Sequence, residues 1–399
     1  MSQPSFRDLG VPAPLVARLA ARGITEPSPI QARALPDALA GHDICGRAPT
    51  GSGKTLAFGL AMAHRVKPGR PRRPRALVLV PTRELASQVQ QELASLVKGG
   101  ANEVVAVYGG IGYGAQRKAL NKGAGIVVAC PGRLEDLVSQ RDVDLSDVDL
   151  VVVDEADRMS DMGFLPAVRR LLDRTSADRQ TMLFSATLDN QVATLVRDYQ
   201  RQPRRHDVVE ESAPADVTHL FWHADRPAKV RLTAELVDRH GSAIVFCRTR
   251  RGADRVTRQL VDAGVRAVAI HGSRSQPQRQ RALSAFVQGH ATALVATDVA
   301  ARGIHVDAIG CVVHFDPPGD AKDYVHRSGR TARAGAVGTV VSLVATEEQP
   351  AVRALQRQLG LEPRLRSPDG TLRADVPSIP RVNPRQARPA PRRNRRRAS

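Results

Sequence analysis

The loop that decides the fold consists of Ala48, Pro49, Thr50, Gly51, Ser52, Gly53, Lys54 and Thr55. It follows the short apolar segment Asp43–Gly46, which we expect to be a strand. Its glycines let backbone N–H groups close around phosphate oxygens at the start of a helix. There the Lys54 ammonium reaches the β and γ phosphates, and the Thr55 hydroxyl ligates Mg²⁺. Ala48 stands where the general pattern has glycine. A chance match in a loop is the alternative, but the strand–loop–helix context predicts a nucleoside triphosphate site.

An acidic motif follows a second apolar run further along the chain. Val151–Val153 leads directly into Asp154 and Glu155, with Asp157 two residues later. A carboxylate at the end of a strand beside a phosphate-binding loop is placed to hold Mg²⁺ through water. Glu155 is then placed to orient and deprotonate an attacking water. A charged turn is the alternative interpretation. Beside the phosphate loop, the motif predicts hydrolysis of the nucleotide.

Two stretches of the chain alternate short β-branched runs with amphipathic segments, which is typical of parallel α/β domains. A length of 399 residues, 42% of them hydrophobic, suffices for two such domains. The segment Glu84–Val97 places its leucines and valines on one helical face. The stretches also echo each other, because Pro81-Thr82-Arg83 and Arg248-Thr249-Arg250 each follow an apolar run. The expected strands, besides Asp43–Gly46, are Ala76–Val80, Val104–Tyr108, Gly125–Ala129, Leu150–Val153, Thr181–Phe184, Ala243–Cys247, Ala267–Ile270, Ala293–Ala296, Cys311–Phe315 and Thr339–Val344.

The charge balance points to a polyanionic partner. There are 59 basic and 40 acidic residues, a net charge of +19. Such an excess favours nucleic acid first and an anionic membrane second, although a compositional bias toward Arg is an alternative. Because only 3% of the residues are aromatic, stacking of bases on aromatic rings cannot be the main contact to nucleic acid. The composition therefore favours contacts to the nucleic-acid backbone that do not read its sequence.

Targeting signals and disulfides are not expected. No apolar run approaches the ~18 residues of a membrane helix, and Met1–Leu19 has no apolar block typical of a signal peptide. The four cysteines are widely spaced and form no CxxC pair. We expect reduced thiols in a cytoplasmic protein without a membrane association.

A polar, proline-bearing segment separates the two stretches, and we place a hinge there, over Arg201–Pro214. The apolar period ends near Leu361. From Pro377 onward the chain is rich in Arg and Pro and has no acidic residue. We expect a disordered basic arm that adds non-specific affinity for RNA. An inert solubilising tail is the alternative.

A basic motif in the second stretch has the residues His326, Arg327, Ser328, Gly329, Arg330, Thr331, Ala332 and Arg333. If the segment is helical, Arg330 and Arg333 share one face. Arginines delivered from a second domain stabilise the negative charge that spreads over the γ-phosphate in the transition state. Such a residue raises the rate of hydrolysis by roughly 10³–10⁵-fold. We therefore expect catalytic roles for His326, Arg330 and Arg333, and a solvated basic helix is the alternative.

Together these motifs resemble the DEAD-box family of ATP-dependent RNA helicases, in superfamily 2, over roughly Phe6–Val344. The resemblance implies an α/β fold with two tandem RecA-like parallel-sheet lobes, a cleft between them and a disordered basic C-terminal tail. It divides the chain into a leading region at 1–35, lobe 1 at 36–205, a linker at 206–216, lobe 2 at 217–361 and the tail at 362–399.

The resemblance also implies how ATP is recognised. Pro27-Ser28-Pro29-Ile30-Gln31 resembles the family's adenine-reading Q motif. In that motif Gln31 bonds the adenine edge, whose N6 and N7 match an amide, and Phe6 stacks on the ring. Gly303 and His305 lie where the family contacts the nucleotide. The residues implied to couple the ATP state to unwinding are Asp157, Ser185 and Thr187.

RNA contacts are implied at loops rich in Gly, Thr and Arg, which suit phosphate and 2′-OH recognition. In lobe 1 they are Pro81, Thr82, Arg83, Gly109, Gly110, Pro131, Gly132 and Arg133. In lobe 2 they are Arg248, Thr249, Gln276, Arg279, Thr297 and Asp298.

Three positions depart from the family's pattern. Cys130 replaces a threonine, so one hydroxyl contact to RNA phosphate is missing. His305 replaces an aspartate that contacts the ribose and the interface between the lobes, which predicts weaker ATP-driven closure. Ser160 replaces an apolar residue after the acidic motif.

The expected function is an RNA-stimulated ATPase that locally unwinds or remodels RNA duplexes, with ATP and Mg²⁺ as cofactors. An ATP-gated RNA clamp or chaperone, a DNA-directed helicase of the same superfamily and a non-enzymatic basic scaffold are the alternatives. We expect a monomer, with ribosome-assembly or RNA-decay proteins as candidate partners.

Overall fold

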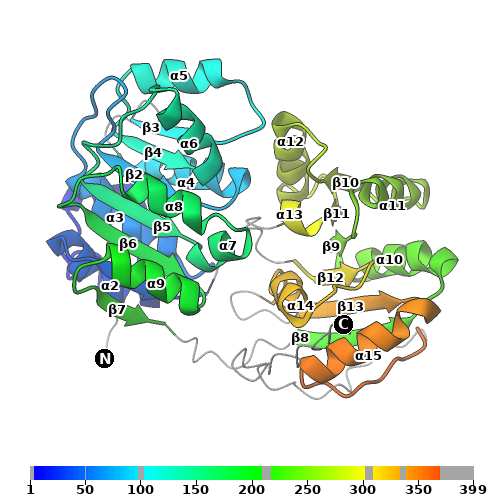
Figure 1. Ribbon diagram of the computed structural model, residues 1–399. Helices are drawn as coiled ribbons and strands as arrows, with labels where there is room; N and C mark the ends of the chain where they lie inside the picture. Colours follow the sequence, from blue (N-terminus) through cyan, green and yellow to red (C-terminus); the bar gives the residue numbers. More distant parts are fainter. Residues whose placement is uncertain are drawn as a thin grey trace, which may run out of the picture. The chain divides into compact units, whose positions relative to one another are not determined.

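The computed structural model describes residues 4–49, 51–97, 103–208, 217–301, 309–332 and 338–368. The chain forms two compact units, which we call lobe 1, up to residue 208, and lobe 2, from residue 217 (Figure 1). In the described part of the chain, no helix is long and apolar enough to cross a membrane.

Lobe 1 is built on a parallel seven-stranded sheet with the order β3-β4-β2-β5-β6-β1-β7. Its strands are β1 Ile44–Arg47, β2 Ala76–Leu79, β3 Val104–Val107, β4 Ile126–Ala129, β5 Leu150–Asp154, β6 Gln180–Ser185 and β7 Arg204–Asp207. Its helices are α1 Ala13–Ala20, α2 Pro29–Ala40, α3 Lys54–Arg65, α4 Arg83–Leu96, α5 Tyr113–Asn121, α6 Pro131–Ser139, α7 Ala156–Asp161, α8 Leu165–Leu172 and α9 Asn190–Tyr199.

The central strands of lobe 1 contribute side chains to two separate hydrophobic cores, one on each face of the sheet, because successive side chains of a strand point to opposite faces. Leu77 and Val151 join the core formed with α5 to α9. Ala76 and Val152 join the core formed with α2, α3 and α4. Burial on both faces explains why these strands read as continuous apolar runs.

Lobe 2 has a parallel six-stranded sheet with the order β10-β11-β9-β12-β13-β8. Its strands are β8 Val217–His223, β9 Ala243–Phe246, β10 Ala267–Ile270, β11 Ala293–Ala296, β12 Cys311–His314 and β13 Gly338–Val344. Its helices are α10 Arg226–His240, α11 Arg250–Asp262, α12 Gln276–Val287, α13 Asp298–Ala301, α14 Ala321–Ser328 and α15 Gln349–Gln358, with a 3₁₀ turn at Thr346–Glu348.

The predicted α/β fold with two parallel-sheet lobes is confirmed, and every expected strand is present to within about one residue at either end. Two segment predictions are wrong in part. The expected hinge begins too early, because Arg204–Asp207 is strand β7 and pairs with β1. The expected tail also begins too early, because Arg366 forms a bridge with Trp222 of β8. Residues 209–216 of the hinge and 369–399 of the tail lie outside the described residues.

Candidate functional site

The phosphate-loop sequence lies between β1 and α3, at the carboxyl end of the lobe 1 sheet. Gly51 and Gly53 both have φ of 90°, a backbone conformation that favours glycine. A Cβ on Gly53 would also come within 2.5 Å of the Gln31 amide nitrogen. The loop therefore requires glycine at Gly53 for two independent reasons. Thr50 lies outside the described residues.

Lys54 begins α3 and is buried. Its Nζ donates to the carbonyl oxygens of Ala48, at 2.9 Å, and Pro49, at 3.2 Å. Carbonyl groups satisfy the ammonium's donors without neutralising its charge. Ala48 is itself buried and donates its N–H to the Ser185 carbonyl at 3.1 Å. A small side chain fits there, which accounts for alanine in place of glycine.

Asp154 and Glu155 lie at the end of β5, and both are buried. Burial raises the pKa of Asp154 to about 7, against the opposing effect of the Lys54 ammonium, and the neighbouring Glu155 raises that pKa further. Glu155 already has a cation partner in Arg158, whereas Asp154 faces only the Lys54 ammonium, so a divalent cation would supply further positive charge beside Asp154. Thr55 stands in the first turn of α3. Among the described residues, no three His, Cys, Asp or Glu side chains cluster as metal ligands. The Asp154 carboxylate and the Thr55 hydroxyl are oxygen donors of the kind that Mg²⁺ binds, with waters completing its coordination shell.

Glu155 has a left-handed backbone, with φ of 55° and ψ of 48°. For a residue other than glycine, this conformation costs about 1–2 kcal/mol, and such strain gathers at functional sites. Its side chain forms an ion pair with Arg158, 2.8 Å from Arg158 Nη1 to Glu155 Oε2. Arg158 is a site residue that the sequence motifs do not identify, since an ion pair between a cap residue and the third residue of a six-residue helix gives no periodic signal.

The three residues predicted to couple ATP state to unwinding lie together. Asp157 donates its N–H to the Ser185 hydroxyl at 3.1 Å. Asp157 Oδ2 accepts hydrogen bonds from the Thr187 N–H, at 3.2 Å, and the Thr187 hydroxyl, at 3.3 Å. The acidic motif after β5 is thus joined directly to the end of β6. The coupling role stays a prediction.

Gln31 connects the leading region to the phosphate loop. Its Oε1 accepts from Ser28 N at 2.9 Å, and its Nε2 donates to the Gly53 carbonyl at 3.0 Å. The Ser28 hydroxyl donates to the Ser52 carbonyl at 2.7 Å. Both ends of the predicted adenine-reading amide therefore bond within the protein, and one of them holds the loop.

Phe6 is 2% exposed and packs in an N-terminal cluster with Leu9, Leu19 and Leu35. The structure thus gives its ring a packing role. Stacking on adenine would require a ring face to be uncovered, so that role stays a prediction.

The predicted RNA contacts of lobe 1 gather around two helix starts. The Thr82 hydroxyl caps α4 by accepting from Leu85 N at 3.3 Å, and Pro81 beside it is buried. The Arg83 guanidinium lies against Gly110, where a Cβ would come within 1.8 Å of it. Gly109 also faces the Arg83 guanidinium. The structure thus brings residues 81–83 and 109–110 together.

A second group lies at the start of α6. Pro131 is buried in its first turn, and Gly132 is exposed. Arg133 donates to the Ile111 carbonyl at 3.0 Å and lies 4.0 Å from the centre of the Tyr113 ring. Arg133 therefore joins this helix to the loop that carries Gly109 and Gly110.

The predicted RNA contacts of lobe 2 divide into exposed and buried groups. Thr249 caps α11 by accepting from Gly252 N at 3.0 Å, and the exposed Arg248 reaches Glu348 at 3.3 Å. Gln276 and Arg279, on the first turn of α12, and Thr297, after β11, are buried. Asp298 accepts a two-point ion pair from Arg327, with distances of 2.6 and 2.7 Å. The carboxylate of Asp298 is thus engaged within lobe 2.

The helical segment that would place Arg330 and Arg333 on one face does not extend as far as Arg330. Helix α14 ends at Ser328, so His326 lies on the helix and the buried Arg330 follows it. Arg327 contacts Asp298, the Asp316 carbonyl at 2.8 Å and the Phe246 ring at 5.1 Å. Arg333, Gly303 and His305 lie outside the described residues. Catalytic roles for His326, Arg330 and Arg333 stay predictions.

Two departures from the family's pattern have structural counterparts. Cys130 precedes the first turn of α6 as its cap residue, without a side-chain capping bond. Ser160 donates its hydroxyl hydrogen bond to Gln191 Oε1 of α9 at 2.9 Å. The serine thus replaces an apolar contact with a polar one.

Comparison with known proteins agrees with this geometry. The family model of the DEAD/DEAH box helicase matches residues 28–195, and that of the helicase conserved C-terminal domain matches residues 228–335. The ATP-dependent RNA helicase DBP2 of Candida glabrata is 40% identical over 385 residues, covering 93% of this chain and 70% of that protein. Saccharomyces cerevisiae Dbp5 bound to RNA and ADP BeF3 superposes with a TM-score of 0.76, at 29% identity, covering 88% of this chain and 93% of that one.

Some relatives are much longer than this chain. The chloroplastic DEAD-box ATP-dependent RNA helicase 3A of Zea mays is 41% identical over 374 residues, which is 90% of this chain and 50% of that protein. The DEAD-box ATP-dependent RNA helicase 30 of Arabidopsis thaliana is 42% identical over 84% of this chain and 58% of its own length. The similarity thus covers the two lobes, which are the parts that define the family. The chain belongs to the DEAD-box family of helicases.

Proposed function

We propose that this chain is an ATP-dependent RNA helicase, which hydrolyses ATP to ADP and phosphate and locally unwinds RNA duplexes. The observation that supports this most is the buried pair Asp154 and Glu155 beside Lys54. Burying charged groups beside a phosphate-binding loop is costly, and a non-enzymatic scaffold protein would not need them.

Lys54 binds the β and γ phosphates in this proposal, exchanging its two carbonyl partners for phosphate oxygens. Thr55 and Asp154 would hold Mg²⁺, which would supply positive charge against the charge that develops on the phosphates. Glu155 accepts a proton from the attacking water while the water oxygen bonds the γ-phosphorus and the bond to the bridging oxygen breaks.

RNA binding in this proposal uses helix starts in each lobe. Thr82 and Thr249 cap α4 and α11, so backbone N–H groups and a partial positive charge lie at those ends. Arg83 and Arg248 stand beside the caps. Such contacts recognise phosphates and sugars without reading bases. The similar protein Dbp5 is bound to RNA in its structure, which supports RNA as the polyanion here.

A reducing compartment such as the cytoplasm completes the proposal. None of the four cysteines forms a disulfide, and Cys45, Cys247 and Cys311 are buried. Burial raises the pKa of the Cys311 thiol to about 12, so it stays protonated and unreactive.

Strand separation is the direct test. A labelled RNA duplex and a DNA duplex of the same sequence are mixed with the protein and ATP, alongside the Glu155→Gln variant. We expect separation of the RNA duplex by the wild type, and ATP binding without separation by the variant. ATP consumption without strand separation would favour an RNA clamp, and equal separation of DNA would favour a DNA-directed helicase.

A further inference from the structure

Arg158 and Glu155 form an ion pair inside lobe 1. Arg158 Nη1 lies 2.8 Å from Glu155 Oε2, and the two side chains are 10% and 4% exposed. Removing a guanidinium and a carboxylate from water is costly, and such a pair is often less stabilising than apolar packing of the same volume. Stability alone is therefore a weak reason for a buried pair at this position.

The backbone around the pair restricts it further. Glu155 has a left-handed backbone and precedes α7, which starts at Ala156. Arg158 lies in the first turn of this helix, and its N–H donates to Asp157 Oδ1 at 3.0 Å. Its side chain folds back toward the residue before the helix. The position of the Glu155 carboxylate is thus determined from both its backbone and its side chain.

Asp157 connects this pair to the end of β6. While its Oδ1 accepts from Arg158, its Oδ2 accepts from Thr187, and its N–H donates to Ser185. A continuous series of hydrogen bonds therefore runs from Thr187 through Asp157 and Arg158 to Glu155. A shift of the segment after β6 would move Arg158, and with it the carboxylate.

We propose that Arg158 is a positioning residue for the general base Glu155. It holds Oε2 and thereby fixes the plane of the carboxylate that faces the attacking water. The guanidinium keeps its proton, so the proton from water goes to Glu155 and none passes to Arg158. The inference rests on the proposed ATPase function. It adds a residue that the acidic motif itself does not contain, and a physical link between Thr187 and hydrolysis.

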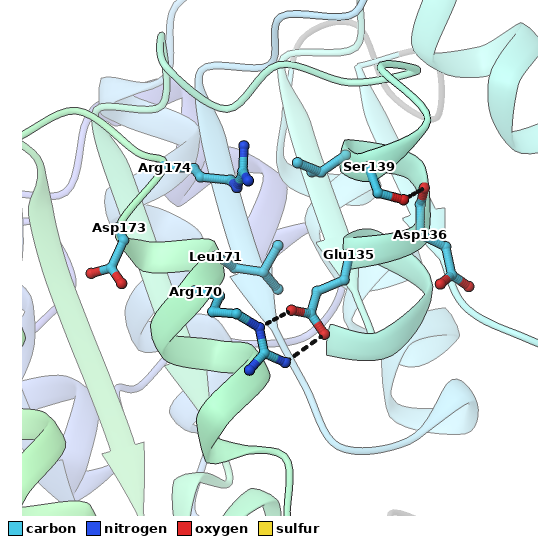
Figure 2. A pocket seen from close by; sticks show the side chains of 8 residues that line it. Glu135, Asp136, Ser139, Arg170, Leu171, Asp173 and Arg174 are labelled. Atoms are coloured by element: carbon cyan, nitrogen blue, oxygen red, sulfur yellow. Dashed lines mark hydrogen bonds and ion pairs between the residues drawn. The ribbon is translucent and has the colours of Figure 1, made fainter.

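Arg170 offers a matched control in the same lobe. Its Nε and Nη2 donate to the two oxygens of Glu135, at 2.6 and 3.2 Å, across a surface pocket between α6 and α8 (Figure 2). This pair has the same chemistry as the Arg158 pair, but its side chains are 61% and 28% exposed. Exposed pairs contribute little to stability, and Arg170 has no part in the proposed reaction.

The experiment compares Arg158→Met and Arg158→Lys with Arg170→Met and Arg170→Lys in the full chain. It measures kcat and KM for ATP at saturating RNA, and thermal unfolding of each variant. We expect kcat of Arg158→Met to fall by about 10²-fold, as for a misplaced catalytic group, with KM unchanged. Arg158→Lys keeps the charge but not the planar fork, so its kcat should lie between those of wild type and Arg158→Met. Both Arg170 variants should match the wild type.

A folded Arg158→Met variant with wild-type kcat would overturn the inference, as would a raised KM with unchanged kcat. If Arg158→Met does not fold, Arg158→Lys decides in the same way: a lowered kcat supports the inference and a wild-type kcat overturns it. Wild-type protein that turns over no ATP would overturn the proposed function, and this inference with it. Normal turnover in the wild type and in both Arg158 variants would overturn the inference alone.

Discussion

Lobe 1 and lobe 2 share one scaffold and differ at the carboxyl ends of two strands. Their strand orders correspond one to one, apart from β7 at the edge of lobe 1. Leu79 pairs with Val153 in lobe 1, and Phe246 pairs with His314 in lobe 2. Three residues after Leu79 and Phe246, Thr82 and Thr249 cap the following helices with nearly equal backbone angles. The faint echo between residues 81–83 and 248–250 therefore reflects a true structural correspondence.

The chemistry differs where the scaffold is the same. By this register, Asp154 and Glu155 of lobe 1 correspond to Phe315 and Asp316 of lobe 2. After β1 the chain makes the phosphate loop, whereas after β8 it passes through Ala224 and Asp225 directly into α10. Lobe 2 thus keeps the helix start suited to an RNA backbone. It lacks the phosphate loop, and of the two carboxylates it keeps only that of Asp316, which accepts from the Arg248 N–H at 2.8 Å.

Among the residues that the structure describes, each lobe buries one lysine near this edge, and the partners of the two lysines differ in charge. Lys54 is bonded to two carbonyls, whereas Lys229 donates to the Phe315 carbonyl at 2.9 Å and to Glu348 at 3.1 Å. Glu348 neutralises Lys229, so that lysine serves the fold. The Lys54 charge stays available to an anionic ligand.

The largest expected effect comes from Lys54→Ala. It removes the cation that stabilises the phosphates, so we expect ATP turnover to fall by at least about 10²-fold. Isothermal titration with ATP should also show weakened binding. Unchanged ATP affinity would contradict the assignment of the phosphate loop to lobe 1.

The counterpart, Lys229→Met, should act on stability. The change removes one of the two cations that contact Glu348 and leaves Arg248 at 3.3 Å, so the loss of stability should lie below the roughly 3–5 kcal/mol of a fully broken buried pair. Urea unfolding should show this loss, while ATP affinity, measured under folding conditions, stays at the wild-type value. A loss of ATP binding equal to that of Lys54→Ala would show that the two lysines do not have separate functions.

Acid should destabilise lobe 2 through His219. Burial lowers the pKa of His219 to about 4, and its Nδ1 lies 2.7 Å from the Tyr324 hydroxyl. The folded state keeps the ring neutral, whereas the unfolded chain protonates it below about pH 6.5. Stability is therefore fully present above pH 6.5 and is lost as the pH falls toward 4, by roughly 3 kcal/mol.

Urea midpoints at pH 7.5 and pH 5 should differ less in His219→Gln than in the wild type. Lobe 1 provides the comparison: burial also lowers the pKa of His206, but Asp37 at 3.0 Å opposes the shift. His206→Gln should change the pH dependence less. An equal pH dependence in His219→Gln and the wild type would contradict a role for His219 in acid sensitivity.

The smallest expected effects come from the paired caps. Thr82→Ala and Thr249→Ala each remove a capping hydroxyl and should cost about 1 kcal/mol. Thr82 is buried and Thr249 is exposed, so the first should cost more. Serine at either position keeps the hydroxyl and serves as the control. If either alanine variant unfolds at the same temperature as the wild type, the two threonines do not have corresponding capping roles in the two lobes.

Strands that are buried on both faces could be predicted from the sequence, because parallel sheets leave continuous apolar runs. Strand β7 could not, since its residues Arg204–Asp207 lie at the sheet edge and are mostly exposed and polar. Strand β8 follows the expected hinge and pairs only with β13 among the named strands. Its aromatic and polar residues, Val217–His223, do not form an apolar run. The formation of such edge strands depends on pairing with a neighbouring strand, and their sequences do not show the apolar run that marks a buried strand.

The site residues could be predicted wherever backbone geometry demands a particular residue type, as at Gly53 and Lys54. Contacts between side chains could not. The pair of Arg158 with Glu155 and that of Arg327 with Asp298 each depend on where a helix turns, which the motif letters do not specify. The burial of Phe6 likewise depends on the packing of α1 against α4.

Steady-state ATP turnover, measured without nucleic acid, with RNA and with DNA of the same sequence, tests the central claim most directly. We predict that RNA alone strongly raises kcat, and that Lys54→Ala abolishes this stimulation while Lys229→Met preserves it. Equal turnover under all three conditions would contradict an RNA-coupled ATPase with its chemistry in lobe 1.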